Sequence, residues 1–465
     1  MSYNFLAVER DQTFLMLPSL TEWLEEDHLA WFVLDAVEQM DLSAFHAGYR
    51  ADGWGRAAHD PKMMVALTLY AYCTGIRSSR AIERACRVDV AFRVVAANQA
   101  PDHTTIARFR ARHEQALASV ITESLRLCGQ AEMVKVGLVA VDGTKMGCPA
   151  ALAANRSKDH LDEQVATMLA EAAQVDAAED ARYGTGSRGN EPPAQLRGAM
   201  PAGSGSPPPR HNWTPPRPRR RRPAHEQHLA ERAAREQASD KKLRGRKPKA
   251  PVPAGEAKAN TSDPESQIMK TKDGYVQGYN AQAVATEDQI VVAAEVTDVH
   301  NDHARLHPMI AATNRSLAEA GIAEAVDRLL ADAGYCSENN LAALTDQDPD
   351  CFIATRNQRR NPQPRNGRRG PLPAAATLVD KMDRKVSIKA GRAVYRKRQH
   401  IIEPVFGQIK DARGARRFMR RGKAAAASEW KLLMGTHNLL KLYRQTLTDP
   451  TAPPWTPRAG APAIC

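Results

Sequence analysis

Apolar residues recur at helical spacing through the first 133 residues of the chain. Those of residues 20–40 fall on one face of a helix. A second apolar stretch begins at Pro61 and ends at Gly75, because proline suits a first helical turn and glycine suits a helix end. Asp102 precedes residues 103–128, whose pattern predicts one long helix capped by that carboxylate. We therefore expect an all-helical N-terminal region.

Short apolar runs, the first of them rich in β-branched residues, predict the strands of a sheet. Four segments carry them: residues 134–142, a hairpin over 278–298, and strands over 326–335 and 350–355. Glu287 and Asp288 mark the hairpin turn, and helical patterns over 304–320 and 337–345 separate the later strands. This order predicts an α/β fold in which helices flank a mixed sheet.

Two segments have a composition that disfavours a packed core. Residues 151–184 are polar, alanine-rich and helical in pattern, but residues 185–262 are rich in Pro, Gly, Arg and Ala. Such a segment buries too little apolar area to offset the conformational entropy of the chain, so we expect it to be largely disordered. We also expect the loop over 357–378 to be disordered. A helical pattern then covers 380–446, and a Pro-rich tail covers 448–465.

Positive charge is concentrated in two blocks. The chain of 465 residues carries a net charge of +12, yet residues 201–250 hold 14 Lys and Arg against 4 Asp and Glu. Residues 356–423 hold 21 against 4, so the rest of the chain is acidic. Blocks of this kind usually meet a polyanion, and we expect DNA contact by the second block. The Arg-rich run at 210–222 is either a solvated linker or a nonspecific phosphate contact.

Composition argues against several classes of protein. The seven cysteines are scattered and form no Cys-x2-Cys pair, which disfavours a zinc finger or a disulfide scaffold. No apolar run reaches the roughly 18–20 residues that span a bilayer, and the N-terminus lacks the basic-then-apolar layout of a secretory signal. His300, His303 and His307 fit a solvated turn better than a zinc site. We expect a soluble cytoplasmic protein.

Three acidic residues occupy positions that favour metal chemistry. Asp142 and Asp332 each end a predicted strand, and Glu403 lies within a basic helical segment. Acidic residues at the carboxyl ends of strands project into the crevice where open α/β sheets bind ligands. Three hard oxygen donors suit Mg²⁺ or Mn²⁺, and two such ions support phosphodiester chemistry. Each residue taken alone also has a structural explanation: either Asp could belong to a turn, and the Glu could belong to an ion pair.

The segments around these acidic residues closely resemble the catalytic segments of DDE-class bacterial insertion-sequence transposases. They are VDGTK at 141–145, ADAGY at 331–335 and VYRKRQHIIEPVFGQIKDARGARRFMRRG at 394–422. Residues 59–94 and 101–113 resemble the InsH-like N-terminal domain of that group, and residues 429–442 resemble its terminal helix. The resemblance implies an RNase H-like core and DNA transposition of the cut-and-paste or copy type.

The resemblance also implies which residues carry the chemistry. It assigns a catalytic and metal-binding triad to Asp142, Asp332 and Glu403, with two Mg²⁺ or Mn²⁺ ions as cofactors. It implies double-stranded DNA as the partner, both the terminal repeats of the element and the target. It further implies a bacterial, cytoplasmic and nucleoid-associated protein.

Many relatives carry a Tyr-x2-Arg-x3-Glu-x6-Lys signature around the glutamate, and this chain departs from it. Lys410 keeps the usual distance from Glu403, but Tyr395 stands eight residues before the glutamate instead of seven. Gln399 occupies the position of the arginine. The candidate phosphate contacts are the polar and basic residues of this segment: Tyr395, Arg396, Arg398 and Lys410.

Pro404 directly follows the glutamate. A mid-helix proline removes one backbone hydrogen bond, so either a helix begins near Glu403 or a kink lies beside the metal site. In a continuous helix, Lys410 and Arg396 would flank Glu403 at two turns either way. A solvated face is the plainer alternative for Lys410.

The N-terminal region contains a candidate DNA-reading helix. Residues 76–86 and 101–113 have the pattern of a helix-turn-helix-like pair. The candidate DNA contacts are the polar and basic residues of its second helix: His103, Thr104, Thr105, Arg108, Arg110 and Arg112. In the plainer alternative, the arginines of this region bridge helices.

These observations predict four parts of the chain. They are a helical DNA-binding domain at 1–133, an RNase H-like catalytic domain at 134–150 and 265–447, an insert at 151–264 and a flexible tail at 448–465. The predicted function is a transposase that acts as a homodimer or larger assembly, because two DNA ends must be joined. The alternatives are a noncatalytic DNA-binding relic and an RNase H-like nuclease without strand transfer.

Overall fold

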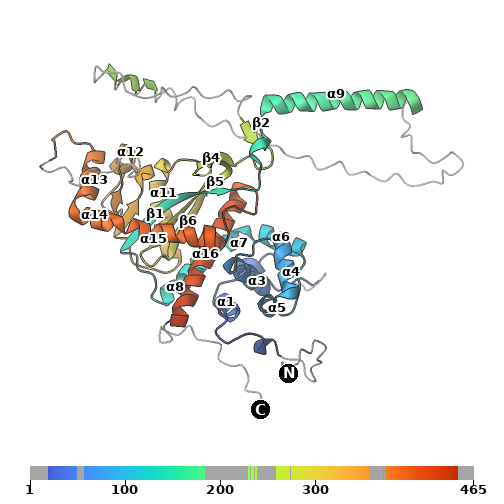
Figure 1. Cartoon of the computed structure of the whole chain (residues 1–465), viewed down its shortest axis with the longest axis horizontal. Helices are drawn as coiled ribbons and strands as arrows, with labels where there is room; N and C mark the ends of the chain where they lie inside the picture. Colours follow the sequence, from blue (N-terminus) through green and yellow to red (C-terminus); the bar gives the residue numbers. More distant parts are fainter. Residues whose placement is uncertain are drawn as a thin grey trace, which may run out of the picture. The chain divides into compact units, whose positions relative to one another are not determined.

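The computed structural model describes residues 19–49, 57–183, 229–237, 258–355 and 370–448, without residues 231, 235, 273 and 371 (Figure 1). The chain divides into two compact units, Met1–Pro149 with Ile268–Cys465, and Ala150–Gln267. The first unit holds a helical N-terminal region and a mixed sheet. The predicted α/β class with an all-helical start is therefore confirmed.

The first unit is built around a six-stranded mixed sheet. Its strands are β1 (Leu138–Gly147), β4 (Gln267–Thr271), β5 (Gly274–Thr286), β6 (Val291–Thr297), β7 (Arg328–Ala331) and β8 (Asp350–Ile353). β6, β5 and β1 are antiparallel neighbours, whereas β7 and β8 run parallel to β1 on its other side. This succession of three antiparallel strands and two parallel ones is the predicted RNase H-like arrangement.

The first strand begins and ends later than the sequence predicts. The pattern places it at 134–142, but β1 continues to Gly147 because residues past Asp142 still pair with β5. Its parallel pairing with β7 stops at Val141, opposite Ala331. Asp142 therefore lies where the parallel part of the sheet ends, and the prediction that it ends the strand is wrong.

Helices flank the sheet, as predicted. Those that follow β6 are η4 (His303–Arg305), α11 (Leu306–Glu319), η5 (Ala333–Tyr335) and α12 (Glu338–Ala342). The C-terminal part adds α13 (Leu378–Ser387), α14 (Lys389–Arg396), α15 (Arg398–Gly407), the π-helical turn η6 (Gln408–Ala412) and α16 (Lys423–Thr448). α11 and α16 pack on β6, and α15 packs on β1 and β5.

The N-terminal region consists of short helices. They are η1 (Leu20–Glu22), α1 (Leu29–Glu38), α2 (Ser43–His46), α3 (Pro61–Cys73), α4 (Ser79–Val88), α5 (Val90–Val95), α6 (His103–Arg112), α7 (Glu114–Ala118) and α8 (Val120–Gln130). The single helix predicted over 20–40 is wrong, because α1 begins only after His28, whose ring caps it by accepting from the Ala30 N–H (3.1 Å).

The single helix predicted over 103–128 is also wrong, since α6, α7 and α8 occupy that range. Asp102 caps α6 as predicted, but His113 leaves the helical conformation at φ −103° and ψ 33°. Its ring packs against Phe45 and Phe109, with ring centroids 5.4 and 4.7 Å away. This buried aromatic contact outweighs the helical periodicity that the sequence carries.

α16 joins the N-terminal helices to the sheet, because it packs on β6, α8, α7 and α3 (Figure 1). The end of α3 contributes to this junction. Gly75 follows the helix at φ +83°, where a Cβ would lie only 3.0 Å from the carbonyl oxygen of Arg413. Glycine thus ends α3, as predicted, and also allows the C-terminal segment to approach.

The second unit contains, in its described part, the long helix α9 (Lys158–Tyr183) and a small sheet of β2 (Asn155–Ser157) and β3 (Lys258–Asn260). The disorder predicted over 185–262 falls mostly outside the described residues. It is wrong for β3, where the Asn260 side chain donates to the Ala151 carbonyl (2.8 Å) and closes the sheet. The predicted loop at 357–378 and tail at 448–465 also lie largely outside the described residues.

The described helices include none that is both long and apolar enough to cross a membrane. α9 and α16, with 26 residues each, are long enough but carry charged side chains along their length.

Candidate active site

Asp142 and Asp332 lie side by side at one edge of the sheet. β1 and β7 pair in parallel up to the residues that directly precede these two acidic residues. Each carboxylate also accepts a hydrogen bond from the backbone that follows it, from Gly143 in one case and from Gly334 in the other, both at 2.8 Å. Parallel pairing thus brings together two acidic residues that are far apart in the sequence.

Glu403 reaches the same region from α15. The helix begins five residues earlier, so the glutamate does not mark a helix start and Pro404 lies within the helix. Pro404 has no N–H to donate to the carbonyl of His400, and Gln289 Nε2 donates to that carbonyl instead (3.1 Å). The departure from regular α-helix lies one turn after the proline, where the helix widens into the π-helical turn η6.

A buried arginine links these carboxylates. Arg398 Nη2 lies 2.6 Å from Asp142 Oδ2, and its Nη1 lies 4.0 Å from Glu403 Oε1. The Arg398 side chain is only 10% exposed, whereas the Glu403 side chain is 56% exposed. Two acidic residues of the predicted triad are therefore bridged by a cation, and the third is the neighbour of Asp142.

Burial dominates the electrostatics of the two aspartates. It raises the pKa of Asp142 to about 7, with the charge of Asp332 adding to the rise and Arg398 opposing it. Burial likewise raises the pKa of Asp332, again against Arg398. Both carboxylates are therefore costly to keep ionised without a nearby cation.

The donor set fits a hard divalent cation, since it consists of carboxylate oxygens at a partly desolvated edge that already attracts a positive charge. Within the described residues, however, no three Asp, Glu, His or Cys side chains converge closely enough to enclose a metal ion. Arg398 accounts for this spacing, because its guanidinium lies between Asp142 and Glu403.

Sequence reasoning missed a fourth acidic residue in the site. Asp302 precedes η4, and its Oδ1 accepts from Asn280 Nδ2 and Gln282 Nε2, both at 2.7 Å. Lys145 Nζ lies 3.9 Å from the same oxygen. The available signal is positional, because β6 is parallel to β1 and its carboxyl end therefore points to the same edge as Asp142.

The candidate phosphate contacts lie at different depths. Tyr395 is half-buried, and burial raises its pKa to about 12, with Asp332, Asp142 and Glu403 adding to the rise and Arg398 opposing it. Lys410 on η6 donates to the Thr144 hydroxyl and to the Lys145 carbonyl (3.0 Å), and burial lowers its pKa to about 8. Arg396 is exposed at the end of α14, which Lys397 separates from α15.

The candidate DNA-reading helix corresponds to α6, which packs on α4, with α5 between them in the chain. Its first residues are engaged locally. The N–H and ring Nδ1 of His103 contact Glu83 at 3.0 and 2.8 Å, and the N–H and hydroxyl of Thr105 donate to Asp102 at 2.8 and 3.1 Å. The exposed candidates are Thr104, Arg108 and Arg112, the last with its guanidinium 4.8 Å from the centre of the Tyr49 ring.

Arg110 does not face solvent, contrary to its predicted role as a DNA contact. Its side chain is buried and donates to the Tyr72 hydroxyl (3.3 Å), the Arg77 carbonyl (2.8 Å) and the Ser79 hydroxyl. Arg87 donates to Glu83 on the same helix, α4, and Arg93 donates to Asn98 just after its own helix, α5, so neither bond bridges two helices as the plainer alternative expected. Arg110 is thus a structural residue of the helical region.

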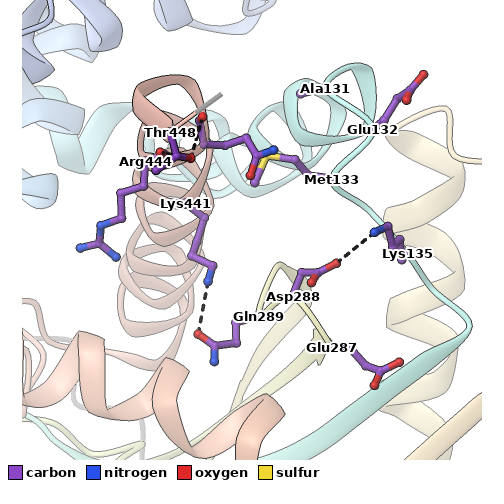
Figure 2. A pocket seen from close by; sticks show the side chains of 11 residues that line it. Ala131, Glu132, Met133, Lys135, Glu287, Asp288, Gln289, Lys441, Arg444 and Thr448 are labelled. Atoms are coloured by element: carbon purple, nitrogen blue, oxygen red, sulfur yellow. Dashed lines mark hydrogen bonds and ion pairs between the residues drawn. The ribbon is translucent and has the colours of Figure 1, made fainter. Parts of the chain in front are cut away.

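A polar pocket of about 520 Å³ lies away from these acidic residues, between the end of α8, the β5–β6 turn and the end of α16 (Figure 2). Lys441 donates to Gln289 Oε1 (3.3 Å), and Lys135 lies 4.0 Å from Asp288. None of the candidate site residues lines it. The acidic edge of the sheet therefore remains the candidate active site.

Two protein-family models match the chain. One, described as a transposase domain (DUF772), matches residues 18–112, which run from η1 to α6. The other, described as a transposase DDE domain, matches residues 355–443, which include Glu403 but neither aspartate. No curated protein and no solved structure matches. Two separate parts of the chain are therefore similar to transposases, and the part that contains Glu403 is similar to the DDE domain of these enzymes.

Proposed function

We propose that the protein binds the terminal inverted repeats of its insertion sequence and catalyses metal-dependent cleavage and strand transfer of phosphodiester bonds. The observation that carries this proposal is that the charges of three acidic residues from separate segments all act on one buried arginine, Arg398. Asp142 and Asp332 are neighbours at the end of a parallel strand pair, and Arg398 lies between Asp142 and Glu403. Sheets of this kind bind ligands at that edge.

In this proposal Asp142, Asp332 and Glu403 would hold two Mg²⁺ or Mn²⁺ ions. Such ions, when bound, activate the attacking oxygen and stabilise the leaving one in an in-line displacement. Arg398 balances the charge of Asp142 in the free protein. With the charge of these carboxylates balanced by a bound cation, the Arg398 guanidinium would be able to donate two hydrogen bonds to a DNA phosphate.

The basic and polar residues around the triad would hold the DNA backbone. Tyr395 and Lys410 lie beside the acidic residues, and Arg396 is exposed nearby. Phosphate contacts of this kind set register and make affinity fall with salt, but they carry no sequence information.

The helical region at 1–133 is proposed to bind the terminal repeats, through the solvent-exposed residues of α4 and α6. Thr104, Arg108 and Arg112 remain candidates for this contact because they are exposed. His103 and Thr105 are instead bonded to Glu83 and Asp102 at the start of α6. A homodimer or larger assembly is proposed because the reaction joins two ends.

The test is cleavage of a labelled duplex that carries the element's own terminal repeats, with Mg²⁺, Mn²⁺ or EDTA. We expect metal-dependent cutting by the wild type, and none by Asp332→Ala or Glu403→Gln although both still bind the repeats. Asp327→Asn is the matched control, because Asp327 is exposed at the opposite end of β7.

Three results would contradict the proposal or part of it. Cleavage retained by Asp332→Ala would exclude the triad. Binding without cutting in any metal would identify a noncatalytic DNA-binding relic. Cutting without joining of ends would identify a nuclease that lacks strand transfer.

A further inference from the structure

Asp302 lies at the centre of a buried polar cluster behind the candidate triad. Its side chain is 18% exposed, and its Oδ1 accepts from two fully buried amides of β5, those of Asn280 and Gln282. Gln282 in turn accepts from the hydroxyl of the buried Tyr335, which directly follows the Asp332-Ala-Gly turn. These bonds connect Asp302 to β5 and to the segment that carries Asp332.

The Asp302 carboxylate also packs directly against the backbone that follows both aspartates. A Cβ at Gly143 would lie 2.7 Å from Asp302 Oδ1, and a Cβ at Gly334 would lie 3.3 Å from Asp302 Oδ2. Gln282 Nε2 would lie closer still to a Cβ at Gly143, and Asp332 Oδ1 would lie 2.9 Å from a Cβ at Gly334. These atoms and Asp302 together leave room only for glycine beside Asp142 and little more than glycine beside Asp332. One side chain thus contacts both turns that hold the two carboxylates.

Charge gives a second, independent reason to assign Asp302 to this site. Lys145 Nζ is shielded from solvent, makes no hydrogen bond within the described residues and lies 3.9 Å from Asp302. Asp142 and Asp332 are the other carboxylates whose charge acts on it. An ammonium held this way offsets part of the negative charge that three neighbouring carboxylates accumulate.

We propose that Asp302 is a fourth acidic residue of the active centre, a positioning residue that holds Asp142 and Asp332 in place and keeps Lys145 among them. The inference rests on the proposed function, because the proposed function names these two aspartates as metal ligands. Residues behind metal ligands commonly change metal affinity or activity about 10- to 100-fold when they are replaced.

The experiment measures Mn²⁺ binding to the full chain by electron paramagnetic resonance, together with single-turnover cleavage of the repeat duplex. We expect Asp302→Asn to raise the Kd for Mn²⁺ about tenfold and to slow cleavage by about 10- to 100-fold, with repeat binding unchanged. Asn keeps the size and an acceptor oxygen, so a role in packing alone would leave the Kd unchanged. Asp288→Asn serves as the control. Asp288 lies in the β5–β6 turn, so this substitution removes an equal charge at a position away from the site.

An unchanged Kd in a folded Asp302→Asn protein would overturn the inference. If that variant does not fold, Asp302→Glu takes its place, since it keeps the charge but moves the carboxylate against Gly143 and Gly334. A Kd equal to that of the wild type would then overturn the inference. A wild type that binds Mn²⁺ but never cleaves DNA contradicts the proposed function alone, whereas a wild type that binds no Mn²⁺ contradicts both.

Discussion

Arg398 is the residue on which the free state of the site depends. Its guanidinium lies 2.6 Å from one carboxylate oxygen of Asp142 in a place where burial already disfavours the charge of that carboxylate. A buried pair of this kind contributes little net stability, but removal of one partner leaves the other charge uncompensated. The pair is therefore a sensitive probe of whether the site exists as described.

We expect Arg398→Gln to lower the free energy of unfolding by about 3 kcal/mol, because Asp142 loses its counter-charge. The double variant Asp142→Asn/Arg398→Gln should recover most of that loss. Arg396→Gln, two residues earlier and exposed, should change stability by no more than about 0.5 kcal/mol. Urea unfolding measures all three, and equal losses in Arg398→Gln and Arg396→Gln would exclude the buried pair.

At this scale the sequence predicts part of the site. Asp142 and Asp332 could be found because each adjoins a short apolar run with the pattern of a strand, and parallel strands present their carboxyl ends at one edge. For Asp302 only its position after β6 gave a signal, because its contacts depend on the register of β5 and on the space beside two glycines. Arg110 has the residue type of a DNA contact, and only the packing of α6 places it inside the protein.

Among the elements, α15 combines two features that oppose each other. It carries Glu403 into the site, yet the proline beside that glutamate removes a helical hydrogen bond. Gln289, in the β5–β6 turn, supplies the missing donor to His400, and its own Oε1 accepts from Gln408 and Lys441 at 3.3 Å. The hairpin turn therefore supports α15 from a distant part of the sequence.

A double-mutant cycle tests this support. Gln289→Ala should destabilise the protein by about 1–3 kcal/mol, since the His400 carbonyl loses its donor. In a Pro404→Ala background the loss should be smaller by about 1 kcal/mol, because residue 404 then offers an N–H to the same carbonyl. Equal losses in the two backgrounds, measured by thermal and urea unfolding, would show that Gln289 acts elsewhere.

The elements also show why helix lengths were harder to predict than helix positions. Periodicity over 103–128 marks a helical region correctly, but three helices occupy it. The break at His113 comes from ring packing with Phe45 and Phe109, residues whose proximity the local sequence does not encode. The mixed character of the sheet was more predictable, since a hairpin gives antiparallel pairing and helical crossovers give parallel pairing.

In the whole molecule, the helical region and the sheet are connected by a buried ion pair. Arg77 Nη1 donates to Glu429 on α16 (3.1 Å) and to the Arg417 carbonyl (2.7 Å), and its Nη2 donates to the Gly414 carbonyl (3.1 Å). Arg110 donates to the Arg77 carbonyl from α6. A proposed DNA-binding region and the segment that follows Lys410 are thus parts of one compact unit.

We expect Arg77→Met to destabilise this unit by about 3–5 kcal/mol, because Glu429 stays buried without its partner. We also expect one cooperative unfolding transition in the wild type, seen alike by far-ultraviolet circular dichroism and by tryptophan fluorescence. Arg80→Met, exposed on α4, is the control and should be nearly neutral. Two separate wild-type transitions would mean that the helices and the sheet are independent.

The central claim is that the acidic edge of the sheet binds the catalytic metal, and Asp332→Cys tests it most directly. A thiolate binds Mn²⁺ far better than Mg²⁺, so a cysteine at a true ligand position changes which metal supports the reaction. We predict cleavage of the terminal-repeat duplex by the wild type in either metal, and by Asp332→Cys in Mn²⁺ but not in Mg²⁺. Undiminished cleavage by Asp332→Cys in Mg²⁺ would contradict the account, because Asp332 would then not be a metal ligand.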